Sequence, residues 1–352
     1  TLAKIEAALG RDDKALKAFT AALALDLTDQ ETIRGLAEVN FRLGDWAGSL
    51  TNFQKVLTAL GEEETEERAE VYYKLGCIKR AQGQAKQAIS NFDKALQLVS
   101  GHRPSLDALV ALYGEVKDYR QVAEYKRQIL DNVIDGEERY KMLHEIADVW
   151  ADQEKNPAKA VEALEEARDI RPDDHKLLHR LMELYQAMQN WDQVINTVQT
   201  IADLETSPKR KGRYLNTLGQ LYRDAMKDPT QAVAYFDKAL DVDPEYLEAF
   251  ERINKVLTGQ KDWKELARAF RRMFKRVAGK GNDDLEYNLL HSTGLIYRDR
   301  MQQPETAVAA FKMASQIKPD STLEHQILAE LYSVIPGRIE DAIGEQQWLL
   351  QQ

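Results

Sequence analysis

The chain has 352 residues, of which 30% are charged and 43% hydrophobic, a composition typical of a folded, soluble protein. Its formal net charge of −10 disfavours DNA or RNA binding, because nucleic-acid-binding proteins usually carry a basic footprint. The single cysteine, Cys77, excludes an internal disulfide, and no run of about 18 apolar residues predicts membrane insertion. A chain without disulfides fits a reducing compartment, so we expect a cytoplasmic location.

Residues 69–100 contain the clearest predicted helix pair. Apolar and small residues recur there at spacings of three and four, Gly83 interrupts the pattern, and the same period then resumes. This pattern predicts a helix, a short turn and a second helix. Gly76 and Ala88 are small where the two helix backbones approach each other, and Phe92 is expected to fill the space beside them.

The same features recur further along the chain at spacings of 72 to 75 residues. Each of these longer units divides into two halves of about 34 to 38 residues, the size of one helix pair. A repeat of this size predicts a solenoid, in which each unit buries its apolar face against its neighbours. The recurring residues are Ala160, Ala232 and Ala307; Pro172, Pro244 and Pro319; Trp191 and Trp263; and Phe236 and Phe311.

The pattern resembles the tetratricopeptide repeat (TPR), a 34-residue helix–turn–helix unit with W-x2-L-G-x2-Y, then A-x3-F, A and P. The resemblance implies an all-α fold, a right-handed superhelical solenoid of about ten TPR units, two of them truncated. Lys79 and Ser100 depart from the pattern in the first matching unit. The matching residues are Tyr72, Leu75, Gly76, Gly83, Ala88, Phe92 and Ala95; Leu218, Gly219, Tyr222, Ala232, Phe236, Ala239 and Pro244; and Gly294, Tyr297, Ala307, Phe311, Ala314 and Pro319.

This register divides a single solenoid, residues 1–352, into ten predicted units. Residues 61–68 form an acidic insertion, which we expect to be a solvated loop or an extra helical turn. Because both chain ends fall inside a repeat, we expect an excerpt of a longer protein. Four units, at 156–160, 228–232, 303–307 and 336–342, carry one extra residue between their helices. The predicted units are 1–29 (partial), 30–61, 69–102, 103–136, 140–174, 175–208, 212–246, 247–281, 287–321 and 322–352 (partial).

No catalytic motif is present: the chain lacks GxxxxGK, HExxH, GxSxG and CxxC patterns. His175 and His179 lie one helical turn apart, but no third strong metal ligand is nearby. We therefore predict that the chain is not an enzyme and needs neither a metal nor a cofactor.

The resemblance implies that the first helix of each unit lines a concave groove through its positions 2, 5, 9 and 12. These positions share one helix face. Arg223 and Arg298 are equivalent in sister units and are predicted to hold carboxylates of a bound peptide. The alternative is pairing with Asp224 and Asp299. The groove candidates are Arg213, Asn216, Gln220, Arg223, Lys255, His291 and Arg298; the same stripe also contains Arg34, Glu38, Arg80, His144, Asp148, His179, Glu183 and Glu251.

A second candidate surface is basic. Residues 261–280 hold eight Lys or Arg but only two acidic residues, Asp262 and Glu265. In an acidic protein this local positive charge favours an acidic partner. The alternative is a solvated face whose cations pair with neighbouring acidic residues. The candidate residues are Arg268, Arg271, Arg272, Lys275 and Arg276.

These features together predict a protein–protein interaction scaffold or adaptor that binds a peptide, helix or small domain in the concave groove. The partner is expected to be another protein, and the basic residues favour an acidic one. The alternative is a regulatory or substrate-recruiting arm of a larger enzyme whose catalytic domain lies outside this chain. A third interpretation, binding of single-stranded RNA, is disfavoured by the acidic composition.

Overall fold

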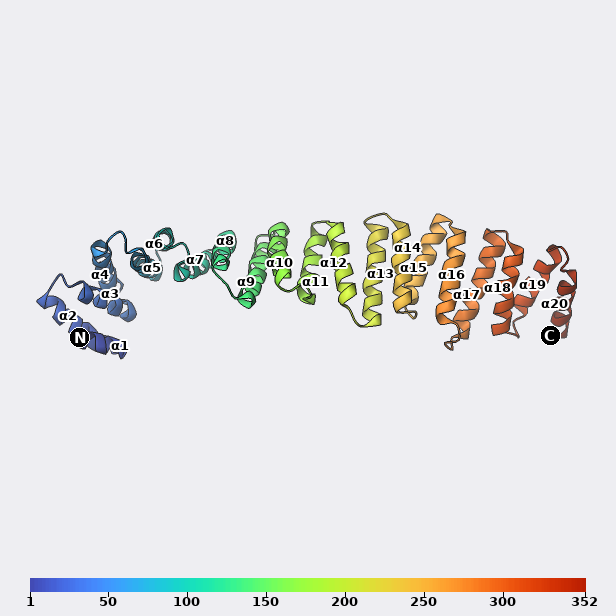
Figure 1. The fold of residues 1–352 in the computed structure, drawn as a ribbon, viewed down its shortest axis with the longest axis horizontal. Coiled ribbons are helices and arrows are strands. Elements are labelled where there is room, and N and C mark those ends of the chain that lie inside the picture. Colours follow the sequence, from blue (N-terminus) through green and yellow to red (C-terminus); the bar gives the residue numbers. More distant parts are fainter. The chain divides into compact units, whose positions relative to one another are not determined.

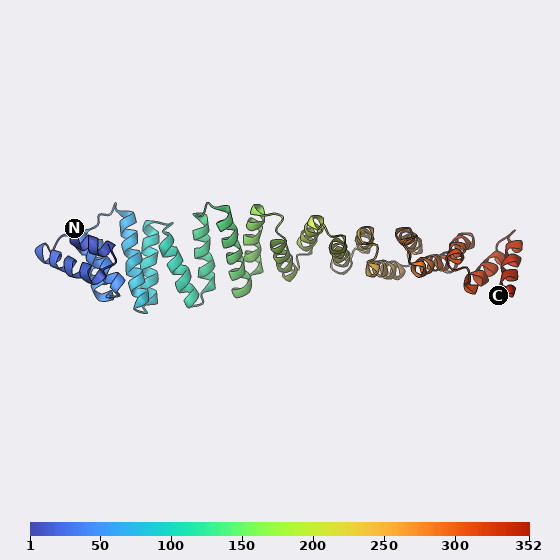
Figure 2. The ribbon, with the colours of Figure 1, turned by 90° about the horizontal axis from the view of Figure 1, so that it is seen from below.

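The computed structural model describes residues 1–352 and contains twenty α-helices, two π-helical turns and no strand. The all-α fold class is therefore confirmed. The helices pack into two compact units, residues 1–177 and 178–352. From α1 to α10, and again from α12 to α20, each helix packs against the helices next to it in the sequence (Figure 1; Figure 2). The division into ten repeat units of one solenoid stays a prediction.

The first unit contains the helices from α1 to α10, and the division between the two units falls within α11. The acidic insertion contributes to this unit: α5 begins at Thr65, so its second half forms the first turn of that helix. The helices are α1 (Leu2–Ala8), α2 (Asp12–Leu25), α3 (Gln30–Leu43), α4 (Trp46–Ala59), α5 (Thr65–Ala81), α6 (Ala85–Leu98), α7 (Arg103–Glu115), α8 (Tyr119–Asp131), α9 (Gly136–Asp148), η1 (Val149–Gln153), α10 (Pro157–Ile170) and α11 (His175–Ala187).

The second unit contains the helices from α12 to α20. None of the helices in either unit combines the length and the apolar character needed to cross a bilayer. The helices are α12 (Trp191–Leu204), α13 (Pro208–Asp224), α14 (Pro229–Val242), α15 (Leu247–Gln260), α16 (Trp263–Val277), α17 (Asp283–Leu295), η2 (Ile296–Arg300), α18 (Pro304–Ile317), α19 (Thr322–Val334) and α20 (Ile339–Gln351).

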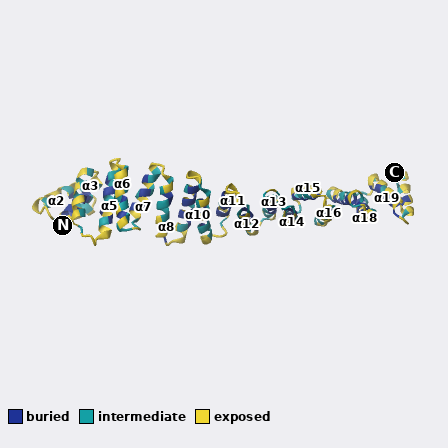
Figure 3. Ribbon diagram, turned by 90° about the horizontal axis from the view of Figure 1, so that it is seen from above, coloured by how far each residue is buried: buried dark blue, intermediate teal, exposed yellow.

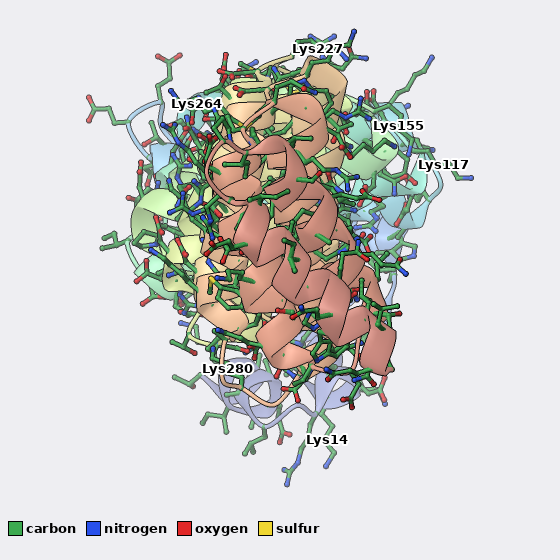
Figure 4. The ribbon with its side chains drawn as sticks, turned by 90° about the vertical axis from the view of Figure 1, so that its right-hand side faces the viewer. Lys14, Lys117, Lys155, Lys227, Lys264 and Lys280 are labelled. Atoms are coloured by element: carbon green, nitrogen blue, oxygen red, sulfur yellow. The ribbon has the colours of Figure 1, made fainter.

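Two kinds of turn join the helices of a pair, and they alternate from α7 to α18. In the compact kind, a capping side chain (Asp118, Asn190 or Asp262) accepts a hydrogen bond from the backbone N–H three residues later. In the longer kind, the second helix begins at a proline, whose missing N–H is not needed in the first turn. A residue with positive φ precedes the cap in both kinds, and Lys117, Lys155 and Lys227 at these places point away from the helices (Figure 4).

The extra residue of the longer units lies inside the end of the first helix and not in the turn between the helices. The backbone N–H groups of Glu154, Met226 and Met301 each donate to the carbonyl five residues earlier, at 3.0–3.1 Å. That bonding pattern defines a π turn, which takes up one residue without breaking the helix. For these three units, the prediction counted the extra residue correctly but placed it a few residues too late; the fourth predicted unit, at 336–342, has no such bond.

In the core of several helix pairs, a glycine on the first helix packs directly against a phenylalanine ring on the second. A Cβ added to Gly219 would lie 2.4 Å from the ring of Phe236, and one added to Gly294 would lie 2.6 Å from the ring of Phe311. Both rings are fully buried. The small residues identified by spacing therefore lie where the helices approach most closely, and the buried residues lie between neighbouring helices (Figure 3).

Candidate protein-binding site

Two predicted groove residues on α13 are used to join α13 to α15. Asn216 is only 4% exposed, its Nδ2 donates to the Tyr246 hydroxyl (3.1 Å), and its Oδ1 accepts from Arg252 Nη1 (2.7 Å). With its amide oxygen facing the guanidinium, Gln220 accepts from Arg252 Nη2 at 2.8 Å. The prediction missed Arg252, which stands next to the stripe residue Glu251 in the sequence.

Arg223 and Arg298 make the pairs that the alternative interpretation named. Arg223 Nε and Nη2 donate to the two carboxylate oxygens of Asp224, both at 2.7 Å. Arg298 Nε donates to Asp299 Oδ1 at 2.6 Å, and these hydrogen bonds lower the pKa of each aspartate. Both guanidiniums keep about a third of their side-chain surface exposed. Such an exposed pair is worth about 0–1 kcal/mol, so binding of a partner carboxylate there stays a prediction.

His291 belongs to a buried cluster around Glu324. Glu324 is 0% exposed; its Oε1 accepts from the Tyr287 hydroxyl (2.6 Å) and lies 2.9 Å from His291 Nδ1, and its Oε2 accepts from Ser321. Burial raises the pKa of Glu324, but the hydrogen bonds from Ser321, Tyr287 and His291 together lower it below its usual value. Because the Ser321 hydroxyl donates to the carboxylate and not to His291, the cluster is not a nucleophile–base pair.

The remaining groove candidates, Arg213 on α13 and Lys255 on α15, are exposed and have no side-chain partner. Close to the same face, a hollow of about 410 Å³ opens between α11, α12 and α13. Gln220 and Asp224 line its edge, and Trp191, Val194 and Val198 are among its apolar lining residues. Arg213 and Lys255 are therefore cations without a side-chain partner on the first helices, and α13 also borders an apolar hollow.

The basic helix α16 has one paired face and one free face. On the paired face, Arg272 Nε lies 2.9 Å from Asp237 Oδ2, and Arg276 Nη1 lies 2.8 Å from Asp237 Oδ1. Burial lowers the pKa of Arg276, but hydrogen bonds to Asp237 and Asp241 raise it overall. Arg268 pairs with Glu265 at 3.1 Å, again within the paired face.

The free face of α16 carries Arg271 and Lys275, which are exposed and have no carboxylate partner. Both side chains border a hollow of about 370 Å³ between α16, the end of α17 with η2, and α18. Sequence alone did not separate these two cations from Arg272 and Arg276, although the four lie on one helix. Elsewhere, no group of three or more His, Cys, Asp or Glu side chains is placed to hold a metal ion.

Several solved structures are similar to this chain. YrrB, described as a TPR protein with an unusual peptide-binding site, aligns at 18% identity and a TM-score of 0.30, over 56% of this chain and 96% of that one. The C-terminal part of a TPR repeat-containing protein from Cytophaga hutchinsonii aligns at 13% identity and a TM-score of 0.38, over 72% and 98%. A tetratricopeptide repeat protein from Parabacteroides merdae gives 15% and 0.34, over 86% and 98%.

No curated protein matches this sequence significantly. Family models described as tetratricopeptide repeat match three separate segments, residues 29–100, 153–209 and 212–246. Tandem repeats of this kind generally form extended surfaces that bind other proteins. Two of the matched segments contain a glycine that packs against a phenylalanine of the partner helix, Gly76 with Phe92 and Gly219 with Phe236. The chain therefore contains tetratricopeptide repeats in these three segments.

Proposed function

We propose that this chain is a protein-interaction scaffold that binds an acidic segment of another protein along the first helices α13, α15 and α17, and that it catalyses no reaction. One observation carries the proposal. Arg213 and Lys255 lie exposed on successive first helices without any carboxylate partner. Unpaired cations on a rigid surface favour carboxylates brought by a partner.

The rigidity of this surface comes from the other stripe residues. Arg252 bridges α15 to Asn216 and Gln220 on α13, and His291 on α17 contacts Glu324 on α19. These contacts fix the spacing of successive first helices, so the backbone positions that carry the free cations are set before a partner arrives. Preorganisation of this kind lowers the entropic cost of binding.

The net charge of −10 does not oppose this proposal. At physiological ionic strength the screening length is about 8 Å, so a bound segment responds mainly to the charges within that distance. Near the stripe, those charges include the unpaired Arg213 and Lys255 and the acidic Glu251. Arg223 and Arg298, each about a third exposed, are already paired with Asp224 and Asp299.

The test is a selection of short random peptides displayed against the full chain. We expect the enriched peptides to be acidic, and we expect Arg213→Glu with Lys255→Glu to weaken their binding about tenfold or more. Lys238→Glu is the matched control, because Lys238 is an exposed lysine on the second helix α14. Peptides that bind the double variant as tightly as the wild-type chain contradict the proposal.

A further inference from the structure

The hollow beside the free face of α16 lies between a compact second helix, the end of the next first helix and a longer second helix. This arrangement of three helices occurs three times in the chain. The compact second helices α8, α12 and α16 start 72 residues apart, and the longer second helices α10, α14 and α18 each start at a proline. The π turns between them also correspond, because the N–H groups of Asn156, Asp228 and Gln303 donate to the carbonyls of Trp150, Tyr222 and Tyr297. This register aligns Arg127, Gln199 and Arg271; Trp150, Tyr222 and Tyr297; Ala163, Tyr235 and Ala310; and Glu166, Lys238 and Met313.

At the first of these places, between α8, η1 and α10, the chain's own charges close the hollow. Arg127 Nη2 pairs with Glu166 Oε1 at 2.5 Å, and Lys159 lies with its Nζ 4.1 Å from the centre of the Trp150 ring. Lys159 Nζ also lies 3.7 Å from a carboxylate oxygen of Glu124. The space that remains is about 190 Å³.

At the second place, between α12, α13 and α14, an aromatic side chain takes the position that is alanine in the other two. The Tyr235 ring stacks on Tyr222, with ring centres 5.1 Å apart and an angle of 11° between the planes. Lys238 Nζ lies 4.4 Å from the centre of the Tyr235 ring. Here a bulky ring with a cation over it covers the end of the first helix.

At the third place, between α16, η2 and α18, neither the internal ion pair of the first place nor the stacked aromatic ring of the second is present. Arg271 keeps the place of Arg127, but the position of Glu166 is occupied by Met313, which is 43% exposed. The position of Tyr235 is occupied by Ala310, and the resulting space is about 370 Å³, nearly twice that of the first place. The result is an apolar hollow with two unpaired cations, Arg271 and Lys275, at its edge.

The sister positions indicate what would complete this hollow. The first supplies a carboxylate to the arginine, and the second supplies a large ring above the tyrosine of the first helix. We infer that the hollow between α16, η2 and α18 is a second protein-docking site, which accepts a segment carrying an Asp or Glu close to an aromatic or large aliphatic side chain. The carboxylate pairs with Arg271 or Lys275, and the apolar side chain packs on Tyr297, Ala310 and Met313.

This site is formed by the second helices α16 and α18 together with the end of α17 and η2. The stripe cations Arg213 and Lys255 do not line it, so binding at either surface can be lost alone. The combination of charge and apolar contact matters for specificity. Exposed cations by themselves attract any anion, whereas a desolvated apolar pocket beside them selects a segment that brings both groups.

Variants that copy the sister repeats test the site with little risk to the fold. Met313→Glu supplies the internal carboxylate found at Glu166, and Ala310→Tyr supplies the ring found at Tyr235. Both substitutions place a side chain that an equivalent helix already carries. Random peptides displayed against the full wild-type chain serve as the probe. Circular dichroism and the urea midpoint report whether each variant is folded.

We expect enriched peptides to combine an acidic residue with an aromatic or large aliphatic one. Their binding should fall about tenfold or more in Met313→Glu, in Ala310→Tyr and in Arg271→Glu. It should persist in the stripe variant Arg213→Glu with Lys255→Glu, so that loss of the stripe and loss of the hollow are told apart.

Three outcomes overturn the inference. The first is a selection that yields no peptide of this kind. The second is binding that Met313→Glu and Ala310→Tyr leave unchanged. The third is an Arg271-dependent affinity for a polyanion without apolar groups, such as an oligonucleotide or an anionic vesicle, because it assigns the cations to general charge attraction.

Discussion

The helix pair α9–α10 of the first unit and the helix pair α17–α18 of the second unit follow the same plan but pack differently inside. Both have a π turn at the end of the first helix and a proline at the start of the second. Where α17 and α18 bring Gly294 against Phe311, the equivalent residues of α9 and α10 are Ala147 and Leu164. All four are buried.

The comparison teaches that one interhelical distance can be filled in two ways. In one pair the bulk lies entirely on the second helix, and in the other it is shared between both helices. Protein interiors are close-packed, so a methyl group added on one side must be removed on the other. The glycine of the repeat pattern is therefore required only where phenylalanine stands opposite.

The largest expected effect comes from breaking that match. Gly294→Ala places a Cβ 2.6–2.8 Å from three atoms of the enclosed Phe311 ring, and overpacking of this kind costs about 1–3 kcal/mol. This exceeds the gain of about 0.5–1 kcal/mol that alanine usually brings to a helix. The free energy of unfolding from urea titration, with amide exchange in α17 and α18, measures the loss.

The matched control is Gly259→Ala on α15, where a Cβ meets no atom within 4 Å. This variant is expected to be neutral or more stable by up to about 1 kcal/mol. If both alanine variants shift the urea midpoint in the same direction, close contact between Gly294 and Phe311 does not control packing of the pair.

A double variant sharpens the comparison. Gly294→Ala combined with Phe311→Leu gives α17–α18 the residues that α9–α10 already use at Ala147 and Leu164. We expect the double variant to be more stable than the sum of the two single changes by about 1–2 kcal/mol, because the leucine removes the clash. Additive single effects in a double-mutant cycle would show that the two pairs are not interchangeable.

Much of this architecture could be predicted from the sequence. The three- and four-residue spacing predicted the helix pairs, and the recurrence of Gly219 with Phe236 and of Gly294 with Phe311 predicted which residues meet. Both signals are local, or repeat at a fixed interval, so one chain is enough to detect them. The π turns were not predicted. A backbone hydrogen bond to the carbonyl five residues earlier changes the sequence only by adding one residue to the unit, and that extra residue does not show where in the unit it lies.

The candidate surfaces were predicted only in outline. Helical periodicity placed Asn216 and Arg213 on one stripe, but it did not show that Arg252 binds Asn216 while Arg213 stays free. Likewise, it did not distinguish Arg276, paired with Asp237 on α14, from Lys275 beside it. Such pairing depends on how neighbouring helices are rotated and spaced, which side-chain packing across the pair decides.

The outer surfaces of the two helix pairs differ in charge pairing. Giving one pair the surface residue of the other should change the free energy of unfolding less than the interior substitutions do. Glu166→Met gives α10 the residue of α18 at Met313 and leaves Arg127 unpaired. The two side chains are 43% and 38% exposed, so solvent screening limits the expected loss to about 0–1 kcal/mol. Glu162→Met, at an exposed and unpaired position of α10, is the control. Equal urea midpoints for both variants at low and high salt would show that the pair contributes nothing.

The two pairs also hold equivalent histidines in different settings. His291 contacts the carboxylate of Glu324. His144 instead packs against Tyr140 at a tilt of 57° between the ring planes, with ring centres 4.6 Å apart, and its Nε2 is buried without a partner. Burial, assisted by the charge of Arg171, lowers the pKa of His144, and the nearby Asp148 and Asp174 only partly oppose this. The folded chain therefore resists protonation of His144 more than the unfolded chain does.

The smallest predicted effect follows from that difference and has a definite sign. An unfolded histidine takes up a proton near pH 6.5, so on acidification the unfolded state binds protons before folded His144 does. Stability contributed by neutral His144 is present above that pH and is lost as the pH falls through about 6.5 toward the lower folded pKa.

We expect the urea midpoint to fall as the pH is lowered from about 7.5 to about 5.5. His144→Phe, which keeps a ring on Tyr140 but cannot take a proton, should reduce this fall. Amide exchange in α9 and α10 should show where protection is lost. An equal fall in the wild-type chain and in His144→Phe would mean that other groups govern the acid response and that the two helix pairs do not differ in this respect.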